Sequence, residues 1–546
     1  MQPSEEETSK KDRGAFFTPY PIARFLTKWA TAGSDAPAVL DPTCGEGVFL
    51  LAANDVTAGR AILHGIDIHP ASIVETQNLL ATVDANPKLT HANFLDLAPS
   101  DGLMDAVVGN PPFVRYQEHT GEARRSGVKA ALAQGVKLSA LSSLWVPILL
   151  HAASFLKPDG RIAMVVPAEL LSVGYAEPVR QWLKRRFRSV HLVMFNDLQF
   201  TDAEAQVVLL VAQGTGGCEA ISLHEVGGNE DLEHLHVFDT AVFVPQEKGK
   251  WTELLIPDEP RRLLRETTSA GFEPVTHLGR IELGTVTGAN KFFTLSEATR
   301  QEYDLVVGSH VVPTLPASSK HLSGMAFTRA QWEQLRSRGE RVWLLYPTDS
   351  LASKGLQRYL KLGEDLKVHE GYKCSNRTPW WRPPRQPAPD LFFTYMSDFG
   401  PRFVQNLAGV TYTNSLHGFH LSPELSDATV SASTIPFLAF NSITLLNAEL
   451  IGRSYGGGVL KMEPREAALL PVPNERGRRA ALEALEGHRE HLAELARTRE
   501  WATLVDEVDK LVLLETDRLT AKDVVELRTA LIRQRLRRQR SIRNNG

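Results

Sequence analysis

The sequence predicts an α/β fold for residues 1–215, followed by an α+β region over residues 216–474 and a helical, basic region over residues 475–546. Short apolar runs alternate with helix-period segments between residues 38 and 167, which is typical of parallel strands joined by helices. Two further apolar runs, at residues 190–195 and 205–211, are close enough to pair as a hairpin. We therefore expect a sheet of seven strands, of which the last two form this hairpin.

Length and composition indicate a soluble protein of two or three domains. The chain has 546 residues, of which 43% are hydrophobic and 23% are charged. We expect a reducing cytoplasm, because the first residues are polar, no apolar run has membrane-spanning length, and Cys44, Cys218 and Cys374 lie far apart. The same spacing predicts no metal site. A net charge of -4 argues against a generally basic nucleic-acid binder, but a local basic face is compatible with it.

The first predicted element is a helix that follows Phe17, Thr18 and Pro19. Thr18 suits the N-cap of a helix and Pro19 its first turn. Apolar residues then recur at helical spacing, at Ile22, Phe25, Leu26 and Trp29. An ordinary capped helix accounts for this stretch when it is taken alone.

The next unit is a strand at residues 38–41, a glycine-rich turn and an apolar helix. The turn reads Asp41-Pro42-Thr43-Cys44-Gly45-Glu46-Gly47. This is the first unit of a nucleotide-binding sheet, but Leu50 takes the place of the third glycine of the dinucleotide fingerprint. Because Asp41 and Glu46 would repel a phosphate, the turn suits a cationic ligand without phosphate.

Two more strands end in polar residues. Asp67 and Ile68 close the run at residues 63–68, and the Asp67 carboxylate lies at the spacing that accepts ribose hydroxyls. A plain sheet core without a ligand is the alternative. Asn93 and Phe94 lie at the end of a third run, where Asn93 or Asp96 could reach an adenine amino group. A polar residue at such a place can equally cap a helix.

The fourth strand delivers Asn110-Pro111-Pro112-Phe113 to the same edge of the sheet. The two prolines fix the backbone and lack amide hydrogens, so the carbonyls near Asn110 face outward as acceptors. The Asn110 carboxamide oxygen and a neighbouring carbonyl can accept both hydrogens of one amino group. Phe113 offers a flat face to a planar ring. The alternative is an ordinary turn.

The remainder of the first part contains a loop, a helix and the last strands. We expect a mobile basic loop at residues 118–139 and a helix at residues 141–155. A buried strand follows at residues 161–167, and Phe200 lies in the loop between the two hairpin strands.

Taken together, these motifs resemble the gamma class of S-adenosylmethionine-dependent DNA N6-adenine methyltransferases of restriction-modification systems. The resemblance covers residues 14–211 and implies a Rossmann-like methyltransferase sheet, S-adenosyl-L-methionine as cofactor and duplex DNA as partner. It places the acceptor chemistry on Asn110, Pro111, Pro112 and Phe113. The cofactor residues that it implies are Phe17, Thr18, Asp41, Thr43, Gly45, Gly47, Asp67, Ile68, Asn93, Phe94 and Asn110.

The chemistry implied is direct methyl transfer to the N6 atom of a flipped adenine. The Asn110 oxygen and the Pro111 carbonyl would draw the amino hydrogens and turn the nitrogen lone pair toward the methyl group. Phe113 and Phe200 would stack on the two faces of the flipped base. Asn93 departs from the aspartate usual in the family, and an amide can still accept one hydrogen bond.

The region after residue 215 resembles a target-recognition domain. Residues 283–293 and 455–461 resemble its first and last segments, and residues 372–385 interleave basic and aromatic side chains in a proline-rich loop. We expect DNA contacts from Arg377, Trp380, Trp381 and Arg382, although a packed aromatic loop with surface arginines is the alternative. The arginine-rich stretch from residue 528 to 543 could bind the phosphate backbone or form a solvated helix.

Three other functions compete with this prediction. Asn-Pro-Pro loops also serve methylation of RNA bases and of protein glutamine, but the large C-terminal half favours DNA. A non-catalytic DNA-specificity subunit is disfavoured by the intact acceptor loop and by Asp67. Since only thirteen residues precede Gly14, we expect no fused nuclease domain there and a separate restriction endonuclease as partner.

Overall fold

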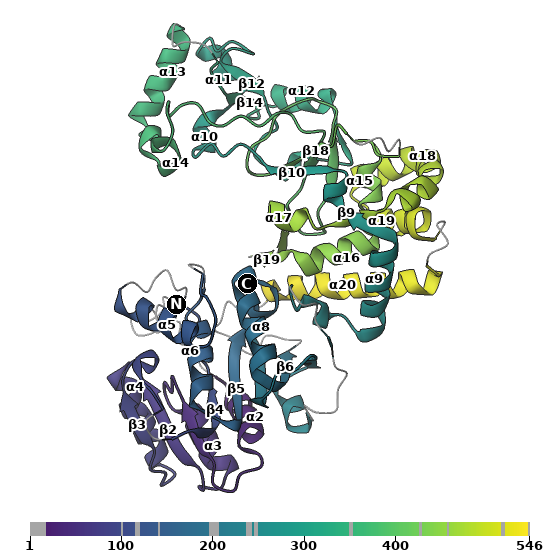
Figure 1. The fold of residues 1–546 in the computed structure, drawn as a ribbon. Helices are drawn as coiled ribbons and strands as arrows, with labels where there is room; N and C mark the ends of the chain where they lie inside the picture. Colours follow the sequence, from purple (N-terminus) through teal and green to yellow (C-terminus); the bar gives the residue numbers. More distant parts are fainter. Residues whose placement is uncertain are drawn as a thin grey trace. The chain divides into compact units, whose positions relative to one another are not determined.

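The computed structural model describes residues 18–99, 102–114, 121–139, 142–195, 207–235, 243–244, 249–348, 353–424, 429–455, 458–514 and 519–543. The chain folds as two compact units, which divide between Leu255 and Ile256 (Figure 1). Each unit has its own sheets and hydrophobic core.

The first unit is built on one sheet with the strand order β3-β2-β1-β4-β5-β7-β6-β8. The strands are β1 (Ala38–Asp41), β2 (Ile62–Asp67), β3 (Lys88–His91), β4 (Met104–Gly109), β5 (Leu156–Pro167), β6 (Phe187–Phe195), β7 (Val207–Thr215) and β8 (Ser222–Val226). Within this sheet only β7 is antiparallel to its neighbours, β5 and β6. The predicted hairpin is confirmed, and β8 is an additional strand that the sequence analysis missed.

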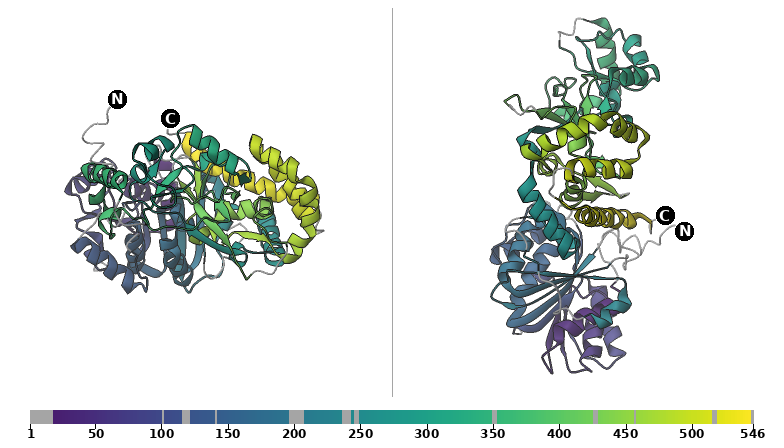
Figure 2. Two further views of the ribbon diagram at one scale, coloured as in Figure 1. Left: turned by 90° about the horizontal axis from the view of Figure 1, so that it is seen from above. Right: turned by 90° about the vertical axis from the view of Figure 1, so that its right-hand side faces the viewer.

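Strand residues alternate between two hydrophobic clusters, one on each face of the sheet. Val39 and Val108 pack with helices α2 and α3, whereas Leu40 and Val107 pack with helices α6 and α8. Figure 2 shows helices on both sides of this sheet. The helices are α2 (Tyr20–Thr31), α3 (Val48–Val56), α4 (Pro70–Ala81), α5 (Glu122–Ala133), α6 (Trp145–Ala152), α7 (Glu169–Ser172) and α8 (Glu177–Arg186). Burial on both faces explains why the central strands are continuous apolar runs.

Helix α5 overturns the expectation of a mobile loop at residues 118–139. Ala130, Ala131 and Val136 lie in the hydrophobic cluster that also contains α6. The basic side chains that suggested a loop, Arg124 and Arg125 among them, are on the exposed face of the same helix. The segment is therefore an amphipathic helix, whose small alanines gave a weak apolar signal.

The first unit extends beyond residue 215, where the sequence analysis placed the domain boundary. Strand β8 pairs in parallel with β6, and Trp251 and Leu254 belong to the hydrophobic core of the sheet. The glycines at residues 214–217 are therefore a turn between β7 and β8 rather than a linker between domains.

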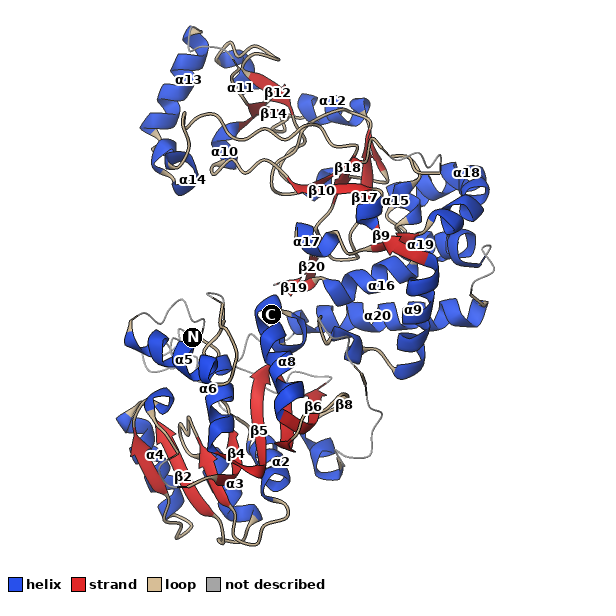
Figure 3. Cartoon of the chain, in the orientation of Figure 1, coloured by secondary structure: helices blue, strands red, loops and turns tan. Residues whose placement is uncertain are grey.

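The second unit combines small sheets with many helices and long loops (Figure 3). Its largest sheet has the order β10-β18-β15-β17-β13. The strands of the unit are β9 (Phe272–Pro274), β10 (Gly279–Leu283), β11 (Thr294–Leu295), β12 (Val311–Pro313), β13 (Ala326–Phe327), β14 (Trp343–Leu345), β15 (Leu391–Phe393), β16 (Met396–Ser397), β17 (Phe403–Asn406), β18 (His417–Leu421), β19 (Arg453–Tyr455), β20 (Val459–Lys461) and β21 (Pro471–Pro473). The α+β character expected for residues 216–474 is thus found from residue 256 onward.

Helices make up most of the rest of this unit. They are α9 (Asp258–Gly271), α10 (Asn290–Phe293), α11 (Glu297–Glu302), α12 (Arg329–Ser337), α13 (Lys354–Asp365), α14 (Tyr372–Ser375), α15 (Ile435–Leu438), α16 (Ser442–Ile451), α17 (Pro464–Ala467), α18 (Glu475–Thr498), α19 (Trp501–Asp509) and α20 (Ala521–Arg543). Leu531 of α20 shares a hydrophobic cluster with Ile256. The C-terminal helices therefore complete the core of the second unit and do not form a separate region.

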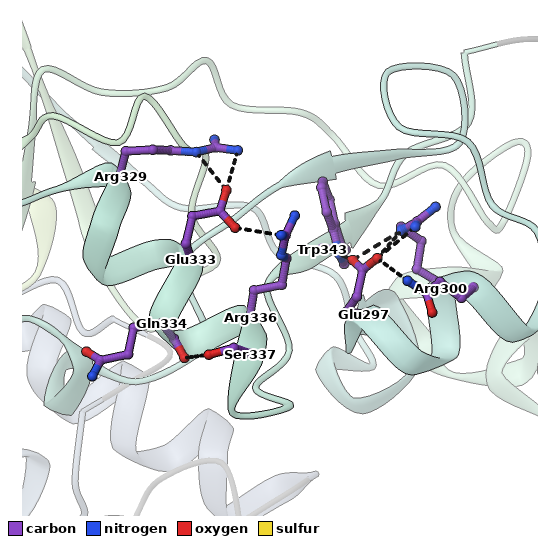
Figure 4. A network of polar contacts seen from close by, with 9 residues as sticks. Glu297, Arg300, Arg329, Glu333, Gln334, Arg336, Ser337 and Trp343 are labelled. Carbon is purple, nitrogen blue, oxygen red and sulfur yellow. Dashed lines mark hydrogen bonds and ion pairs between the residues drawn. The ribbon is translucent and has the colours of Figure 1, made fainter.

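Arginine–carboxylate networks use several of the arginines at α11 and α12 (Figure 4). Glu297 accepts hydrogen bonds from Arg300 Nη2 and from Trp343 Nε1, both at 2.7 Å. These hydrogen bonds lower the pKa of Glu297 to about 2. Glu333 pairs in the same way with Arg329 at 3.0 Å and Arg336 at 2.8 Å. These arginines are engaged within the protein.

The arginines of α20 do not form the exposed basic surface that their sequence suggested. Arg538 is 6% exposed and its Nε and Nη2 atoms bond the carboxylate of Glu449 at 2.9 and 2.8 Å. Arg535 lies over the ring of Phe399 at 3.7 Å, and Arg528 pairs with the buried Asp509 at 2.8 Å. Because these three side chains bind partners in the second unit, they are not free to clamp a phosphate, and the helix is packed rather than a solvated tail.

Among the described residues, no helix combines the length and the apolar character needed to cross a bilayer.

Candidate active site

The candidate site lies where three parallel strands of the first unit end. β1 pairs with β2 and with β4, so Asp41, Asp67 and Asn110 come to the same edge of the sheet. The ends of β1 and β4 lie close together, because a Cβ atom added to Gly109 would lie 2.8 Å from Asp41 Oδ1. Ligands bind at this edge in open α/β sheets.

The glycine turn after β1 has a shape that its two glycines permit. Gly45 and Gly47 have φ angles of +52° and +87°, a region that other residues rarely adopt. A Cβ atom on Gly47 would meet Thr76 of α4 at 2.9 Å. Thr76 Oγ1 donates to the Gly45 carbonyl at 2.8 Å, and the Gly45 amide donates to Asp67 Oδ2 at 2.9 Å. The turn is thereby held against the end of β2.

Thr76 is a positioning residue that the sequence analysis missed. It is fully buried in the middle of α4, and its hydroxyl holds the glycine turn. Because Thr76 lies 29 residues beyond Gly47, inside a helix of its own, no local motif marks it.

Asp41 is a buried carboxyl group with one oxygen unused. It is 1% exposed, and its Oδ1 atom accepts a hydrogen bond from the Thr43 amide at 3.1 Å. Its Oδ2 atom has no hydrogen-bond partner among the described residues, and neither has the buried Thr43 hydroxyl. Burial raises the pKa of Asp41 to about 8, and repulsion from Asp67 adds to the shift. An unpaired buried acceptor of this kind fits a cationic ligand group.

Asp67 is oriented by two backbone amides. Its Oδ1 atom accepts from His69 at 2.8 Å, in addition to the Gly45 bond at Oδ2, and the residue is 8% exposed. Each carboxylate oxygen can accept a second hydrogen bond, so this group can still bind two hydroxyls. The adjacent Ile68 is 56% exposed at the end of the strand.

Asn93 and Phe94 are engaged inside the protein. Asn93 accepts from the Leu95 amide at 3.3 Å and donates to Asp96 Oδ2 at 2.7 Å, so it caps the short 3₁₀-helix η1 (Phe94–Asp96). The Phe94 ring packs against His151 at a centroid distance of 4.9 Å. The structure thus shows the capping alternative for Asn93, while both residues remain close to the end of β3.

The acceptor loop is anchored on both sides. Asn110 Nδ2 donates to Thr18 Oγ1 at 3.1 Å, and Thr18 is 4% exposed ahead of α2. At the other end, the Val114 carbonyl accepts from Ser143 Oγ at 2.9 Å and from the Leu144 amide at 3.0 Å. This arrangement fixes the orientation of the Asn110 carboxamide.

Of the two aromatic residues expected to stack on the target base, the structure describes Phe113 but not Phe200. Phe113 is partly buried and packs against both hydrophobic clusters of the sheet, with one part of its ring exposed. Pro111 is buried and Pro112 half-buried. Phe17 and Phe200 lie outside the described residues.

In the second unit, the aromatic-basic loop is packed rather than free. Trp381 is 9% exposed within a hydrophobic core, and Trp380 packs on Phe292 at a centroid distance of 5.8 Å. Arg377 Nη2 donates to the Thr287 carbonyl at 2.5 Å. Arg382 is exposed, with its guanidinium 5.0 Å from the Trp381 ring. The tryptophans therefore support the arginines and are not available for wedging into DNA in this conformation.

The described residues contain no group of three or more histidine, cysteine, aspartate or glutamate side chains that could hold a metal ion.

Comparisons with known proteins match both units. The N-6 DNA Methylase family model matches residues 5–211, and the model for the C-terminal domain of the type II methyltransferase M.Eco57I matches residues 248–513. The type II methyltransferase M.AccI of Acinetobacter calcoaceticus is 24% identical over 84% of this chain and 84% of its own. M.XamI of Xanthomonas campestris pv. amaranthicola is 26% identical over 84% and 85%.

Among solved structures, a type I restriction-modification methyltransferase subunit from Streptococcus thermophilus superposes with a TM-score of 0.35 at 18% identity. That likeness covers 42% of this chain and 55% of the other and is too distant to guide assignment. The two family matches and the two relatives agree with each other along almost the whole chain. On these matches the chain is a methyltransferase of the N6-adenine DNA methylase family, of the restriction-modification kind.

Proposed function

We propose that this protein is a gamma-class enzyme that methylates the N6 atom of adenine at a specific site in duplex DNA, with S-adenosyl-L-methionine as cofactor. The observation that carries the proposal is the meeting of Asp41, Asp67 and the loop at residues 110–113 at one edge of the sheet. Both halves of such a reaction, a cofactor site and an amino-group acceptor, are thereby side by side.

The residues present fit the cofactor. S-adenosyl-L-methionine carries an ammonium group, a ribose and a methylsulfonium centre, and it lacks phosphate. The unpaired Asp41 Oδ2 would accept a hydrogen bond from the ammonium group, and Asp67 would bind the ribose hydroxyls. When bound, the cofactor supplies the methyl group. Gly45, Gly47, Thr43 and Thr18 would shape the methionine end of the site.

The adenine end of the cofactor site would be formed by residues at the ends of β2 and β3. Ile68, Phe94 and Asn93 would lie beside the adenine of the cofactor, and Phe17 would close the site near Thr18. Since Asn93 is occupied as a cap, the backbone near η1 is better placed than its amide to read the ring.

The acceptor loop would activate the adenine amino group without a separate base. Asn110 Oδ1 and the Pro111 carbonyl would accept the two N6 hydrogens, and this favours a tetrahedral nitrogen whose lone pair faces the methyl group. Pro112 keeps the loop rigid because its ring fixes φ. The amino nitrogen would gain the methyl carbon as the carbon–sulfur bond of the sulfonium breaks and a neutral thioether leaves, and one of the nitrogen's protons would pass to solvent.

An adenine within a duplex cannot reach a loop at the sheet edge, so base flipping is part of the proposal. Flipping costs a few kcal/mol, which stacking on Phe113 would partly offset. Phe200 would cover the opposite face of the base.

The second unit would bind the DNA. Arg377 and Arg382 would contact DNA, and Trp380 and Trp381 would hold the loop that carries them. We further propose a separate restriction endonuclease as the partner enzyme and the cytoplasm, where such DNA lies, as the compartment.

The test is mass spectrometry of nucleosides from duplex DNA incubated with the protein and S-adenosyl-L-methionine, beside an N110A variant. N6-methyladenine with the wild type alone is the expected result. If N110A retains wild-type turnover, the role of the loop is refuted. If the wild type binds the cofactor but yields no methyladenine in DNA, RNA and protein glutamine become the acceptors to examine.

A further inference from the structure

A cavity of about 290 Å³ lies entirely within the second unit, apart from the cofactor site and the acceptor loop. Its wall comes from the 3₁₀-helix η8 (Ser319–His321), the turn that follows β16 and the junction of α18 and α19. Three segments that are distant in sequence thus enclose one space.

The charges on the wall are unbalanced. Lys320, Arg402 and Arg499 contribute three cations, and Asp398 contributes one carboxylate. None of the three cations forms an ion pair with a carboxylate in the part of the chain that the structure describes. Most arginines described above have such a pair, so this cavity differs from the rest of the unit.

Arg402 is the cation that the fold holds most firmly. Its Nη1 and Nη2 atoms donate to the carbonyls of Gly324 and Leu322 at 2.9 and 3.1 Å, and its guanidinium lies 4.5 Å from the Trp501 ring. Burial lowers its pKa to about 10, so it stays charged at neutral pH. A guanidinium withdrawn from water is costly unless an anion compensates it.

Arg499 reaches the cavity through an unusual backbone conformation. It follows α18 with φ +62°, in the left-handed region where glycine is the usual residue. Repulsion from Arg499 also lowers the pKa of Arg402, while the Asp398 carboxylate acts in the opposite direction. Repulsion of this kind is relieved when an anion lies between the cations.

We propose that this cavity binds a phosphate group, with Arg402, Arg499 and Lys320 as its cationic ligands. The hydroxyls of Ser318, Ser319 and Ser397 line the same space and can donate to phosphate oxygens. The phosphate is either that of the DNA backbone or that of a free phosphorylated molecule. The inference goes beyond methyl transfer and does not rest on it, because no residue of the first unit is involved.

The test compares two glycine substitutions in the full chain. R499G removes a cation from the cavity at a position whose φ suits glycine. K367G is the control: it also replaces a cation with φ in the left-handed region (+56°), but this lysine is exposed and does not line the cavity. Inorganic phosphate is titrated and followed by ³¹P line broadening, and duplex DNA is titrated by fluorescence anisotropy. R402Q is a third variant, which should weaken phosphate binding as R499G does. Urea denaturation checks the folding of the second unit, and S-adenosyl-L-methionine affinity is measured separately for the first unit.

We expect R499G to weaken phosphate binding at least fivefold and K367G to leave it unchanged. If R499G also weakens DNA binding and free phosphate competes with DNA, the ligand is the DNA backbone. If DNA affinity is unchanged while phosphate binding falls, the ligand is a free phosphorylated molecule. The proposal is overturned if R499G and K367G bind both phosphate and DNA equally well. Because cofactor affinity is measured separately, failure here is distinguishable from failure of the proposed methyl transfer.

Discussion

Asn110 and Thr18, which lie 92 positions apart in the chain, are joined by a hydrogen bond of 3.1 Å from Asn110 Nδ2 to Thr18 Oγ1. This contact ties the acceptor loop to the start of α2 and decides which way the carboxamide points. Replacement of Thr18 therefore tests the orientation of Asn110 without changing Asn110 itself.

We expect T18V to lower kcat for methyl transfer about 10- to 100-fold, because a misaligned acceptor loses the positioning advantage. T18S, which keeps the hydroxyl, should restore most of the activity. The measurement is turnover on duplex DNA together with calorimetric affinity for S-adenosyl-L-methionine. If T18V keeps the turnover of the wild type, the hydrogen bond does not orient Asn110.

The raised pKa of Asp41 predicts a pH dependence of cofactor binding. Burial raises this pKa to about 8, so below that pH the carboxyl must lose a proton when an ammonium group binds. Affinity for S-adenosyl-L-methionine should rise from pH 6 to about pH 8, by at most about tenfold per unit. Calorimetry at pH 6, 7 and 8 checks this, and affinity that is constant with pH would count against an ammonium partner at Asp41.

The same shift fixes the sign of a stability effect in the free protein. Between about pH 4 and pH 8 the native protein holds a proton on Asp41 that the unfolded chain has released, so stability falls as pH rises. The D41N variant lacks this group. Its stability relative to wild type should therefore increase over that range, as measured by urea denaturation without cofactor.

The inward arginines of α20 predict a loss of stability rather than of DNA affinity. R538A removes both hydrogen bonds to the buried Glu449 and leaves it only the 3.8 Å ion pair with Arg535, which should cost up to about 3–5 kcal/mol of unfolding free energy. R533A, at an exposed position of the same helix, should change stability by less than about 0.5 kcal/mol. Chemical denaturation measures the unfolding free energy of both variants. Equal values for R538A and R533A would contradict the conclusion that Arg538 is a buried, paired residue.

The aromatic-basic loop separates into two kinds of residue with different expected effects. R382A should weaken DNA binding and reduce its salt dependence, because the side chain is exposed. W381A should instead lower stability by about 3–5 kcal/mol through loss of core packing. Anisotropy titrations at several salt concentrations, with denaturation curves alongside, measure both. If R382A and the wild type bind DNA with similar affinity, Arg382 does not contact DNA and its role is structural.

The site residues at the edge of the sheet were predictable from the sequence, because each lies at the end of an apolar run, next to a recognisable motif. Asp41, Asp67 and Asn110 each follow an apolar run, and the parallel order of the strands brings them together as expected. One prediction failed because a local signal was weak, as for the alanines of α5, and others failed because they depended on side-chain direction or on long-range pairing. Arg538 counts as a basic residue in any sequence window, but only the fold turns it toward Glu449. Similarly, β8 is short, and its place in the sheet comes from pairing with β6.

The packing of α20 on the first residues of the second unit also determines when that unit can fold during synthesis. The core sheet of the first unit is complete once β8 has emerged from the ribosome, whereas the cluster containing Ile256 requires Leu531. The first unit can therefore adopt its structure while the second is still being translated. A nascent chain interrupted before α20 would carry a formed sheet in the first unit and a second unit with an open, aggregation-prone core.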